Sequence, residues 1–501
     1  MGFGATRFGF RSRVLIGAVA LGAALSACGT WSVNATDSPV RAAHIALMHN
    51  GKVLLVAGSG NQAGEFTAGR FKTSVWDPVA NTFRSVATPW DAFCSGHAQL
   101  ADGRLLVAGG TGAYASAATH NAFAGTPRAY AFDPDTNSYV RVADMSTARW
   151  YPSLVTLGDG SVLALGGQGT DGLLTHTWQQ FTGSAWTTDQ QPPTRPDTGG
   201  PEQWPMYPGL HLLADGRVFF SGAHAFGDPP PPGIWNLTNN TFQIVGGSVD
   251  LNHTDQGMSV LLPPAQDQKV MMIGGGNGDG SVSTSATNVI DLKQPNPTYT
   301  AAASLDTPKM YVSAVLLPDR TVFETGGAMR YRELPDSYVQ SAQIFDPTTG
   351  AWSKAASPAV PRGYHSSAVL LPDGRVATFG NNPADKSFEL RIELYSPPYL
   401  SKGTRPVITS APTDLTYGAT GVVTTTQAAP IRNLSLVRPM AVTHSMDSNQ
   451  RLVDVPFTRN PDGSLQVSLT NNPNLAPPGW YMLFAVDQTG VPSVATWVHI
   501  H

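Results

Sequence analysis

The chain has 501 residues, a formal net charge of −4, only 13% charged residues, and an abundance of glycine (51) and proline (40). This length exceeds what one hydrophobic core ordinarily fills, so we expect several domains or a repeated unit. The slightly acidic balance provides no basic patch of the kind that phosphate-rich partners need, which excludes nucleic acid as an expected partner.

The first residues are typical of an export signal. Arg7, Arg11 and Arg13 precede an apolar run over 14–24 that is too short to span a bilayer comfortably. The run leads into Leu-Ser-Ala-Cys, which resembles a bacterial lipobox ending at Cys28. This resemblance implies that residues 1–28 form a lipoprotein-type signal peptide and that the Cys28 thiol is acylated. We therefore expect a lipoprotein on the bacterial cell envelope that meets the membrane only through its lipid anchor; ordinary secretion is the alternative.

Cys94 is the only other cysteine. If Cys28 carries lipid, Cys94 has no disulfide partner, which is unusual for an exported protein because an oxidising compartment exposes a bare thiol to oxidation. We expect the Cys94 thiol to be occupied in another way.

Residues 29–400 contain seven copies of one pattern: an alternating strand, a tight polar turn, and an apolar strand ending in glycine. Four short strands per copy at this period are typical of a kelch-like propeller blade, and Asp-Gly between alternating runs is a strong hairpin signal. The pattern predicts an all-β chain with a seven-bladed kelch-like β-propeller. The first turns, 52 to 57 residues apart, fall at Gly51, Gly103, Gly160, Gly216, Gln268, Arg320 and Gly374.

The repeats end at Tyr395-Ser396-Pro397-Pro398-Tyr399-Leu400. Residues 401–501 show a different β pattern with proline-rich turns, which predicts a C-terminal immunoglobulin-like (early-set) β-sandwich domain.

Residues at one offset from the first turn share one depth in the propeller channel, because the first strand of each blade lines the axis. Each residue type found there is ordinarily structural when it occurs alone. A ring that combines a cysteine, tyrosines and a histidine is not what apolar packing selects, so it predicts a site. Nine residues before the turns stand Ala42, Cys94, Tyr151, Tyr207, Ser259, Tyr311 and His365, and Tyr364 precedes the last of them.

Four motifs carry a resemblance to a known family. They are Phe93-Cys94-Ser95-Gly96, Ala148-Arg149-Trp150-Tyr151, Gly363-Tyr364-His365-Ser366, and Thr443-His444-Ser445 with Gln450-Arg451 close behind. In these motifs and their order, over nearly the whole mature chain, the sequence resembles the galactose oxidase and glyoxal oxidase family of copper-radical oxidases. Arg-Trp-Tyr and the run Tyr-Pro-Gly-Leu-His-Leu-Leu from Tyr207 are closer to the glyoxal oxidase-like branch.

The resemblance implies a copper ion bound by Tyr151, Tyr364, His365 and His444. Imidazole and phenolate ligands suit copper(II). It also implies a thioether between Cys94 and Tyr151, which forms a protein-derived radical cofactor; Tyr364 acts as the general base, and no nucleotide or flavin is required. Because His444 lies in the tail, a loop of the last domain is expected to reach up the channel.

The tryptophan that covers the crosslink in galactose oxidase has no counterpart at 166–170, where the sequence is Gly-Gly-Gln-Gly-Thr. Trp204, in the proline-rich insertion before blade four, is the proposed substitute.

Four other residues are expected near the site. Tyr207 and Tyr311 are expected directly behind the copper ligands, where they can hydrogen-bond them. Arg330 and Arg332 lie in a loop on the mouth side, where an arginine can hold a substrate carboxylate or carbonyl oxygen.

The expected activity is oxidation of a small aldehyde, as its hydrate, or of a primary alcohol by O2, with release of hydrogen peroxide by a monomer. The alternative is a non-catalytic, surface-anchored kelch-type propeller that binds polysaccharide or protein, since propellers host many functions. Loss of any one ligand or of Cys94 would favour that alternative, and none is missing. A sialidase-like hydrolase is disfavoured because the repeated Ser-x-Asp-x-Gly-x-x-Trp boxes are not found.

Overall fold

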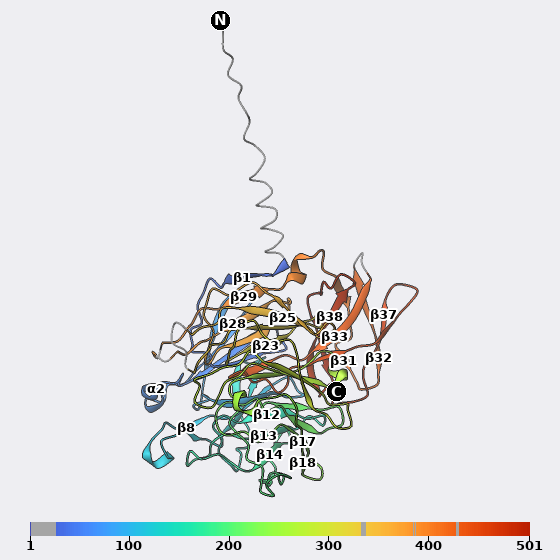
Figure 1. Ribbon diagram of the computed structural model, residues 1–501. Helices are drawn as coiled ribbons and strands as arrows, with labels where there is room; N and C mark the ends of the chain where they lie inside the picture. The colour runs from blue at the N-terminus through green and yellow to red at the C-terminus, as the bar shows by residue number, and fades with distance from the viewer. Residues whose placement is uncertain (2–26, 332–336, 384, 386, 427–429) are drawn as a thin grey trace.

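The computed structural model describes residues 1, 27–331, 337–383, 385, 387–426 and 430–501. The predicted signal sequence up to residue 26 and Arg332 lie outside the described residues. Within the described part, seven small antiparallel sheets follow one another as propeller blades, and two further sheets form a sandwich beside them (Figure 1). The fold prediction is confirmed. No helix in the described ranges is both long and apolar enough to cross a membrane.

The blades are built mainly from strands that follow one another in the sequence, and in blades two to seven the first strand lies nearest the axis. The described residues give blade three only three strands. The strands in blade order are β2 (His44–Leu47), β3 (Val53–Gly58), β4 (Lys72–Asp77) and β5 (Thr82–Ala87); β6 (Ser95–Gln99), β7 (Leu105–Gly109), β10 (Ala129–Asp133) and β11 (Ser138–Arg141); β12 (Ser153–Thr156), β13 (Val162–Leu165) and β14 (Trp178–Phe181); β15 (Leu210–Leu212), β16 (Val218–Phe220), β17 (Gly233–Asn236) and β18 (Thr241–Ile244); β19 (Met258–Leu261), β20 (Lys269–Ile273), β21 (Thr287–Asp291) and β22 (Tyr299–Ala301); β23 (Ser313–Leu316), β24 (Val322–Thr325), β25 (Ala342–Asp346) and β26 (Ala351–Lys354); and β27 (Ser367–Leu370), β28 (Val376–Phe379) and β29 (Glu393–Ser396).

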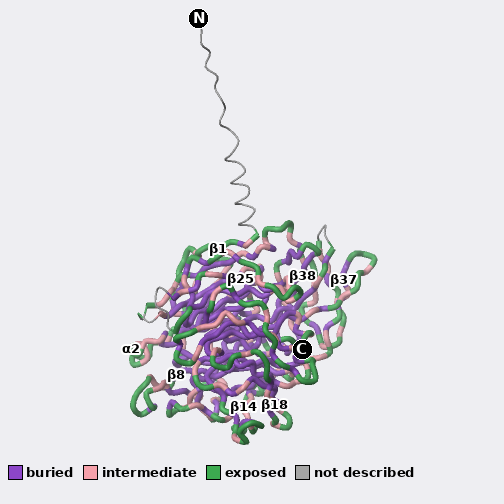
Figure 2. The backbone as a smooth tube through the Cα atoms, viewed as in Figure 1, coloured by how far each residue is buried: buried purple, intermediate pink, exposed green. Residues whose placement is uncertain are grey.

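The first hairpin of every blade bends where the sequence predicts. All seven predicted turn residues have positive φ, from 54° at Gln268 to 88° at Gly103. Five of them are glycines, the residue type that adopts this conformation without steric cost. The strands that follow, such as β3, β7 and β13, are buried along their whole length. Buried backbone fills the interior of the molecule, and exposed backbone lies mostly at its edges (Figure 2).

An N-terminal strand closes the ring. β1 (Thr30–Val33) pairs antiparallel with β29, so blade seven takes its outermost strand from the other end of the propeller sequence. We call the pair of β1 and β29 the clasp. Trp31 anchors it, because its ring centroid lies 5.0 Å from that of Tyr395 and its Nε1–H donates to the Ala356 carbonyl at 2.6 Å.

The C-terminal segment forms the sandwich. One sheet has the order β30 (Val407–Ser410), β32 (Thr420–Thr426), β37 (Leu465–Ser468) and β36 (Phe457–Arg459), and the other has β31 (Asp414–Leu415), β39 (Thr496–Ile500), β38 (Gly479–Asp487), β33 (Ile431–Val437) and β35 (Leu452–Asp454). The division at residue 400 stays a prediction; β29 and β30 lie on either side of it.

One strand of the C-terminal segment belongs to the propeller. β34 (Ala441–Thr443) leaves the sandwich and pairs antiparallel with β2, with Thr443 opposite His44. Blade one therefore gains an innermost fifth strand, and the residue after that strand, His444, is carried to the propeller axis.

Candidate metal centre

A ring of residues in left-handed backbone conformation surrounds the axis. Cys94, Tyr151, Tyr207, Tyr311 and His365 all have φ between 44° and 66°. The Tyr151 N–H donates to the Cys94 carbonyl and the Tyr207 N–H donates to the Tyr151 carbonyl, each at 2.8 Å. Residues other than glycine are uncommon in this region and cluster at functional sites. The offset rule thus locates the ring in five blades.

The rule fails in blade five. Gln256, with φ of 54°, occupies the ring position there, and its carbonyl accepts the Tyr311 N–H at 2.8 Å. The predicted member, Ser259, lies three residues further on, inside β19. The cause is a longer hairpin turn, which contains a 3₁₀ helix over Ala265–Asp267 before Gln268.

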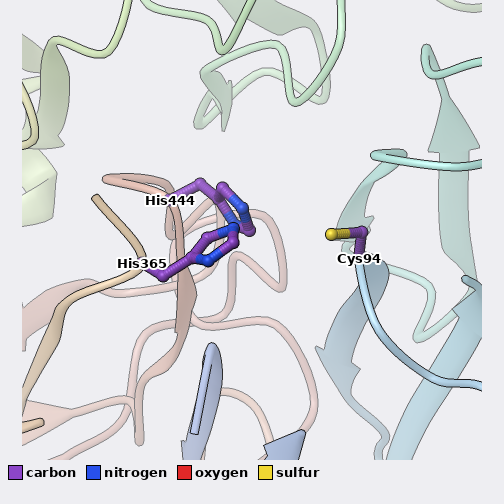
Figure 3. Close-up of side chains that lie close together, drawn as sticks. All are labelled: Cys94, His365 and His444. Atoms are coloured by element: carbon purple, nitrogen blue, oxygen red, sulfur yellow. The ribbon is translucent and has the colours of Figure 1, made fainter. Parts of the chain in front are cut away.

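The structure brings the predicted ligands together. The hydroxyl oxygens of Tyr151 and Tyr364 are 2.7 Å apart. The His444 ring centroid lies 4.5 Å from that of Tyr151 and 4.4 Å from that of His365. The Cys94 Sγ and one imidazole nitrogen of each histidine all lie within 4.8 Å of one another, with the sulfur directed towards the two rings (Figure 3). All five side chains are buried.

Hydrogen bonds orient both histidines for metal binding. The Thr443 hydroxyl donates to the Ala43 carbonyl, so it accepts from the Nδ1–H of His444. The Nδ1–H of His365 donates to Asn382 Oδ1 at 3.1 Å. The proton is thus held on Nδ1 in each ring, and Nε2 is the remaining ligand atom. His444 Nε2 is buried and has no hydrogen-bond partner among the described residues.

The charge states also fit a metal centre. Burial lowers the pKa of His444 well below its ordinary value, and the neighbouring His365 and His44 lower it further, so the ring stays neutral. Burial raises the pKa of Tyr151 well above its ordinary value, with Cys94 and Tyr364 adding to the effect. A bound cation would compensate the ionisation of this phenol and release its proton. Two imidazoles and two phenols fit copper(II).

Trp204 does not cover Tyr151, and that expectation is wrong. Its ring contacts Trp235 at 5.5 Å and Phe220 at 5.8 Å, in the apolar core between blades three and four. Its large apolar surface is fully buried there, which outweighs any attraction to the axis.

Trp150 contacts Tyr151 instead. The two ring centroids are 4.0 Å apart with planes inclined at 42°, and Phe123 stacks parallel on the far side of Trp150 at 4.5 Å. Trp150 stands next to Tyr151 in the Ala-Arg-Trp-Tyr motif. The resemblance to galactose oxidase did not indicate Trp150, because it places the covering tryptophan downstream of the modified tyrosine.

The two tyrosines predicted around the ligands both contact them through their rings. Tyr207 lies 4.4 Å from Tyr151, while its hydroxyl donates to the Ser95 carbonyl at 2.7 Å. Tyr311 lies 5.6 Å from Tyr364. That Tyr207 and Tyr311 hydrogen-bond the copper ligands stays a prediction.

Two further aromatic side chains, Phe226 and Tyr331, lie beside the site. Phe226 lies 6.1 Å from Tyr151 and 6.2 Å from Tyr364, and Tyr331 lies 5.7 Å from Phe226. Phe226 has φ of 65°, and its N–H donates to the buried Asp255 carboxylate at 2.9 Å. Arg330, the described member of the predicted arginine pair, is exposed in the same loop as Tyr331.

A seven-bladed propeller with buried imidazole, phenol and thiol groups at its axis, completed by a strand from a C-terminal sandwich, defines a class of propellers with an axial metal centre. Residues 71–399 match the family model described as the glyoxal oxidase N-terminus, and residues 405–500 match the galactose oxidase-like early set domain. The chain belongs to this glyoxal oxidase and galactose oxidase family of copper-radical oxidases.

Relatives along the whole chain agree with this assignment. The chain is 27% identical to a galactose oxidase of Gibberella zeae, over 90% of this chain and 67% of that protein. It is also 27% identical to an aldehyde oxidase of Vitis pseudoreticulata, over 94% and 97% of the two chains. A solved fungal alcohol oxidase in complex with copper superposes with a TM-score of 0.80 at 25% identity, covering 94% of this chain and 99% of that one.

Proposed function

We propose that this protein oxidises a small aldehyde, as its hydrate, or a primary alcohol with O2 and releases hydrogen peroxide. One observation carries the proposal: Tyr151, Tyr364, His365 and His444, from three distant parts of the sequence, converge beside Cys94 in one buried site. Membership in the oxidase family and the activities for which its relatives are named support it.

Four side chains would hold the copper ion: Tyr151, Tyr364, His365 and His444. When bound, the ion would supply a one-electron acceptor beside the substrate oxygen. A thioether between Cys94 Sγ and the Tyr151 ring would form with loss of two hydrogens, for which O2 is the oxidant. Sulfur on the ring delocalises an unpaired electron, so Tyr151 would store the second oxidising equivalent.

The two phenol oxygens have different roles in the proposed reaction. Tyr364 Oη takes the proton of the substrate hydroxyl, and Tyr151 Oη, 2.7 Å away, takes a hydrogen atom from the adjacent carbon. The substrate thus loses a proton, a hydrogen atom and one further electron. Dioxygen takes up the two electrons and two protons as hydrogen peroxide. The short separation matters because a misplacement of about 1 Å can cost roughly a hundredfold in rate.

We also propose that the protein is an exported monomer whose only membrane contact is a lipid on Cys28. The Cys28 carbonyl accepts hydrogen bonds from Tyr395 Oη at 2.7 Å and from the Ala356 N–H at 2.8 Å. Cys28 is thereby held two residues before the β1 clasp, so a lipid on its thiol would join the propeller without a linker.

A peroxide-coupled assay tests the activity. The copper-loaded mature protein is screened against glyoxal, methylglyoxal, glycolaldehyde, galactose and glycerol. We expect peroxide from at least one of them, and loss of most turnover in Tyr364→Phe. Cys94→Ala should lose turnover too, and its intact mass should lack the two-hydrogen deficit that the thioether produces in the protein without the substitution. Full copper occupancy with no peroxide from any compound would favour the non-catalytic binding propeller.

A further inference from the structure

A second cluster of metal-binding side chains lies on the sandwich. Asp414, His499 and His501 each offer a ligand atom, and these atoms lie within 4.8 Å of one another. We propose that this cluster is a surface site for a divalent transition cation, Zn²⁺ or Cu²⁺, separate from the axial centre.

The sheet places these three residues on one face. β31 and β39 run parallel, with Asp414 opposite His499. The backbone N–H of His499 donates to the Thr413 carbonyl at 2.8 Å, and that of His501 donates to the Leu415 carbonyl at 3.2 Å. Alternate residues of a strand share a face, so the two imidazoles lie on the same side. The backbone ladder thus holds the ligand atoms close together before any ion binds.

A hydrogen bond fixes the orientation of the His499 ring. Its Nε2 donates to the Ala101 carbonyl at 2.8 Å, because a carbonyl can only accept. Its Nδ1 faces Asp414 Oδ1 at 3.2 Å. This separation suits two ligand atoms that each lie about 2.0–2.2 Å from one ion.

The donor set selects the kind of ion. Two imidazoles and one carboxylate suit Zn²⁺ or Cu²⁺, whereas Mg²⁺ and Ca²⁺ prefer oxygen alone. Asp414 and His501 are exposed, so the ion is reachable from solvent and water can complete its coordination.

The cluster lies where the sandwich meets the propeller. The hydrogen bond of His499 to Ala101 crosses that junction, and His499 also contacts Trp480 at 5.2 Å. Trp480 stacks on His49 of blade one at 4.9 Å, with ring planes 14° apart. An ion bound to the folded state alone stabilises it by mass action, so we expect Zn²⁺ to raise the melting temperature.

Calorimetric titration with Zn²⁺ tests the site, on the full chain loaded with no more than one copper ion per chain so that copper does not occupy the surface cluster. We expect one zinc ion per chain beyond the axial copper, with affinity lowered about tenfold or more in His501→Ala and in Asp414→Asn. His499→Gln should weaken binding likewise while its amide still donates to Ala101. The electron paramagnetic resonance signal of the axial copper should not change.

His253→Ala is the matched control. His253 also pairs with an aspartate, Asp250, at 2.7 Å, but no third ligand atom completes that pair in the described part of the chain. This variant should bind Zn²⁺ as the unmodified protein does. Unchanged affinity in both His501→Ala and His499→Gln would overturn the site, as would an absence of zinc binding by the unmodified protein. The calorimetric titration measures zinc binding without any substrate turnover, so its result is independent of the test of oxidase activity.

Discussion

An amide, rather than a carboxylate, orients one of the proposed copper ligands. Asn382 Oδ1 accepts from His365 Nδ1 and from Asn61 Nδ2 at 3.0 Å. Loss of such a partner typically lowers metal affinity about 10–100-fold. Asn382→Ala should therefore weaken copper binding by that factor in a competition titration. Asn61→Ala leaves the acceptor of His365 in place and should have a much smaller effect; equal effects would contradict this role of Asn382.

Phe226 is the residue whose removal should change substrate range. Its ring lies 6.1 Å from that of Tyr151 and 6.2 Å from that of Tyr364. Truncation of Phe226 leaves space beside both phenols and keeps all four proposed ligands. In Phe226→Ala we expect kcat/KM for a bulky aromatic aldehyde or alcohol to rise relative to glyoxal, with copper affinity unchanged. Val140→Ala, on an exposed outer strand, should leave the ratio as it is. An unchanged ratio in Phe226→Ala would show that another residue limits access.

Asp255, which holds the Phe226 backbone, should make stability depend on pH. Burial raises the pKa of Asp255 to about 7, against about 3.9 in an unfolded chain. The folded state binds this proton more tightly, so the stabilisation is fully present below about pH 4 and is lost as the pH rises through about 7. Asp255→Asn keeps an acceptor for Phe226 and removes this dependence. The unfolding free energy of Asp255→Asn minus that of the protein without this substitution should rise by roughly 4 kcal/mol between about pH 4 and pH 8. Urea unfolding at the two pH values measures the change, and parallel curves would rule out this role.

At the scale of elements, the clasp strand β1 should stabilise the ring through Trp31. This half-buried ring contacts Tyr395 and Phe323 and donates to a carbonyl. We expect Trp31→Ala to lower the unfolding free energy by about 2 kcal/mol, less than a fully buried tryptophan would cost. Val33→Ala on the same strand, at an exposed position, should change it little. Thermal unfolding distinguishes the two, and equal melting temperatures would exclude an anchoring role for Trp31.

Elements with a local signal could be predicted from the sequence, and those that depend on long-range packing could not. Turn residues such as Gly103 and Gly160 mark the hairpins because positive φ has a residue preference. The shift from Ser259 to Gln256 was not predictable from a fixed offset, since it depends on the length of one turn. The pairing of β34 with β2 joins segments about four hundred residues apart, and no local pattern encodes that contact.

At the scale of the whole molecule, the sequence predicted the architecture and the residues that gather at the axis. It also placed Tyr207 and Tyr311 beside those residues, but it did not predict their other neighbours. Trp150 and Thr443 precede predicted ligands in the sequence, whereas Asn382 is far from any of them. The contacts of all three with the predicted ligands follow from three-dimensional packing. Trp204 shows the converse, because a tryptophan placed near the axis by strand direction is drawn into the nearest apolar core.

The position of His444 has a consequence for when the protein can act. This proposed ligand enters the axis on a strand that follows all seven blades in the sequence. A growing polypeptide, or one cut before residue 444, lacks part of the proposed ligand set. Under the proposed function, peroxide would therefore be made only by chains that extend past residue 444, and copies that end before it would not expose the producing cell to peroxide.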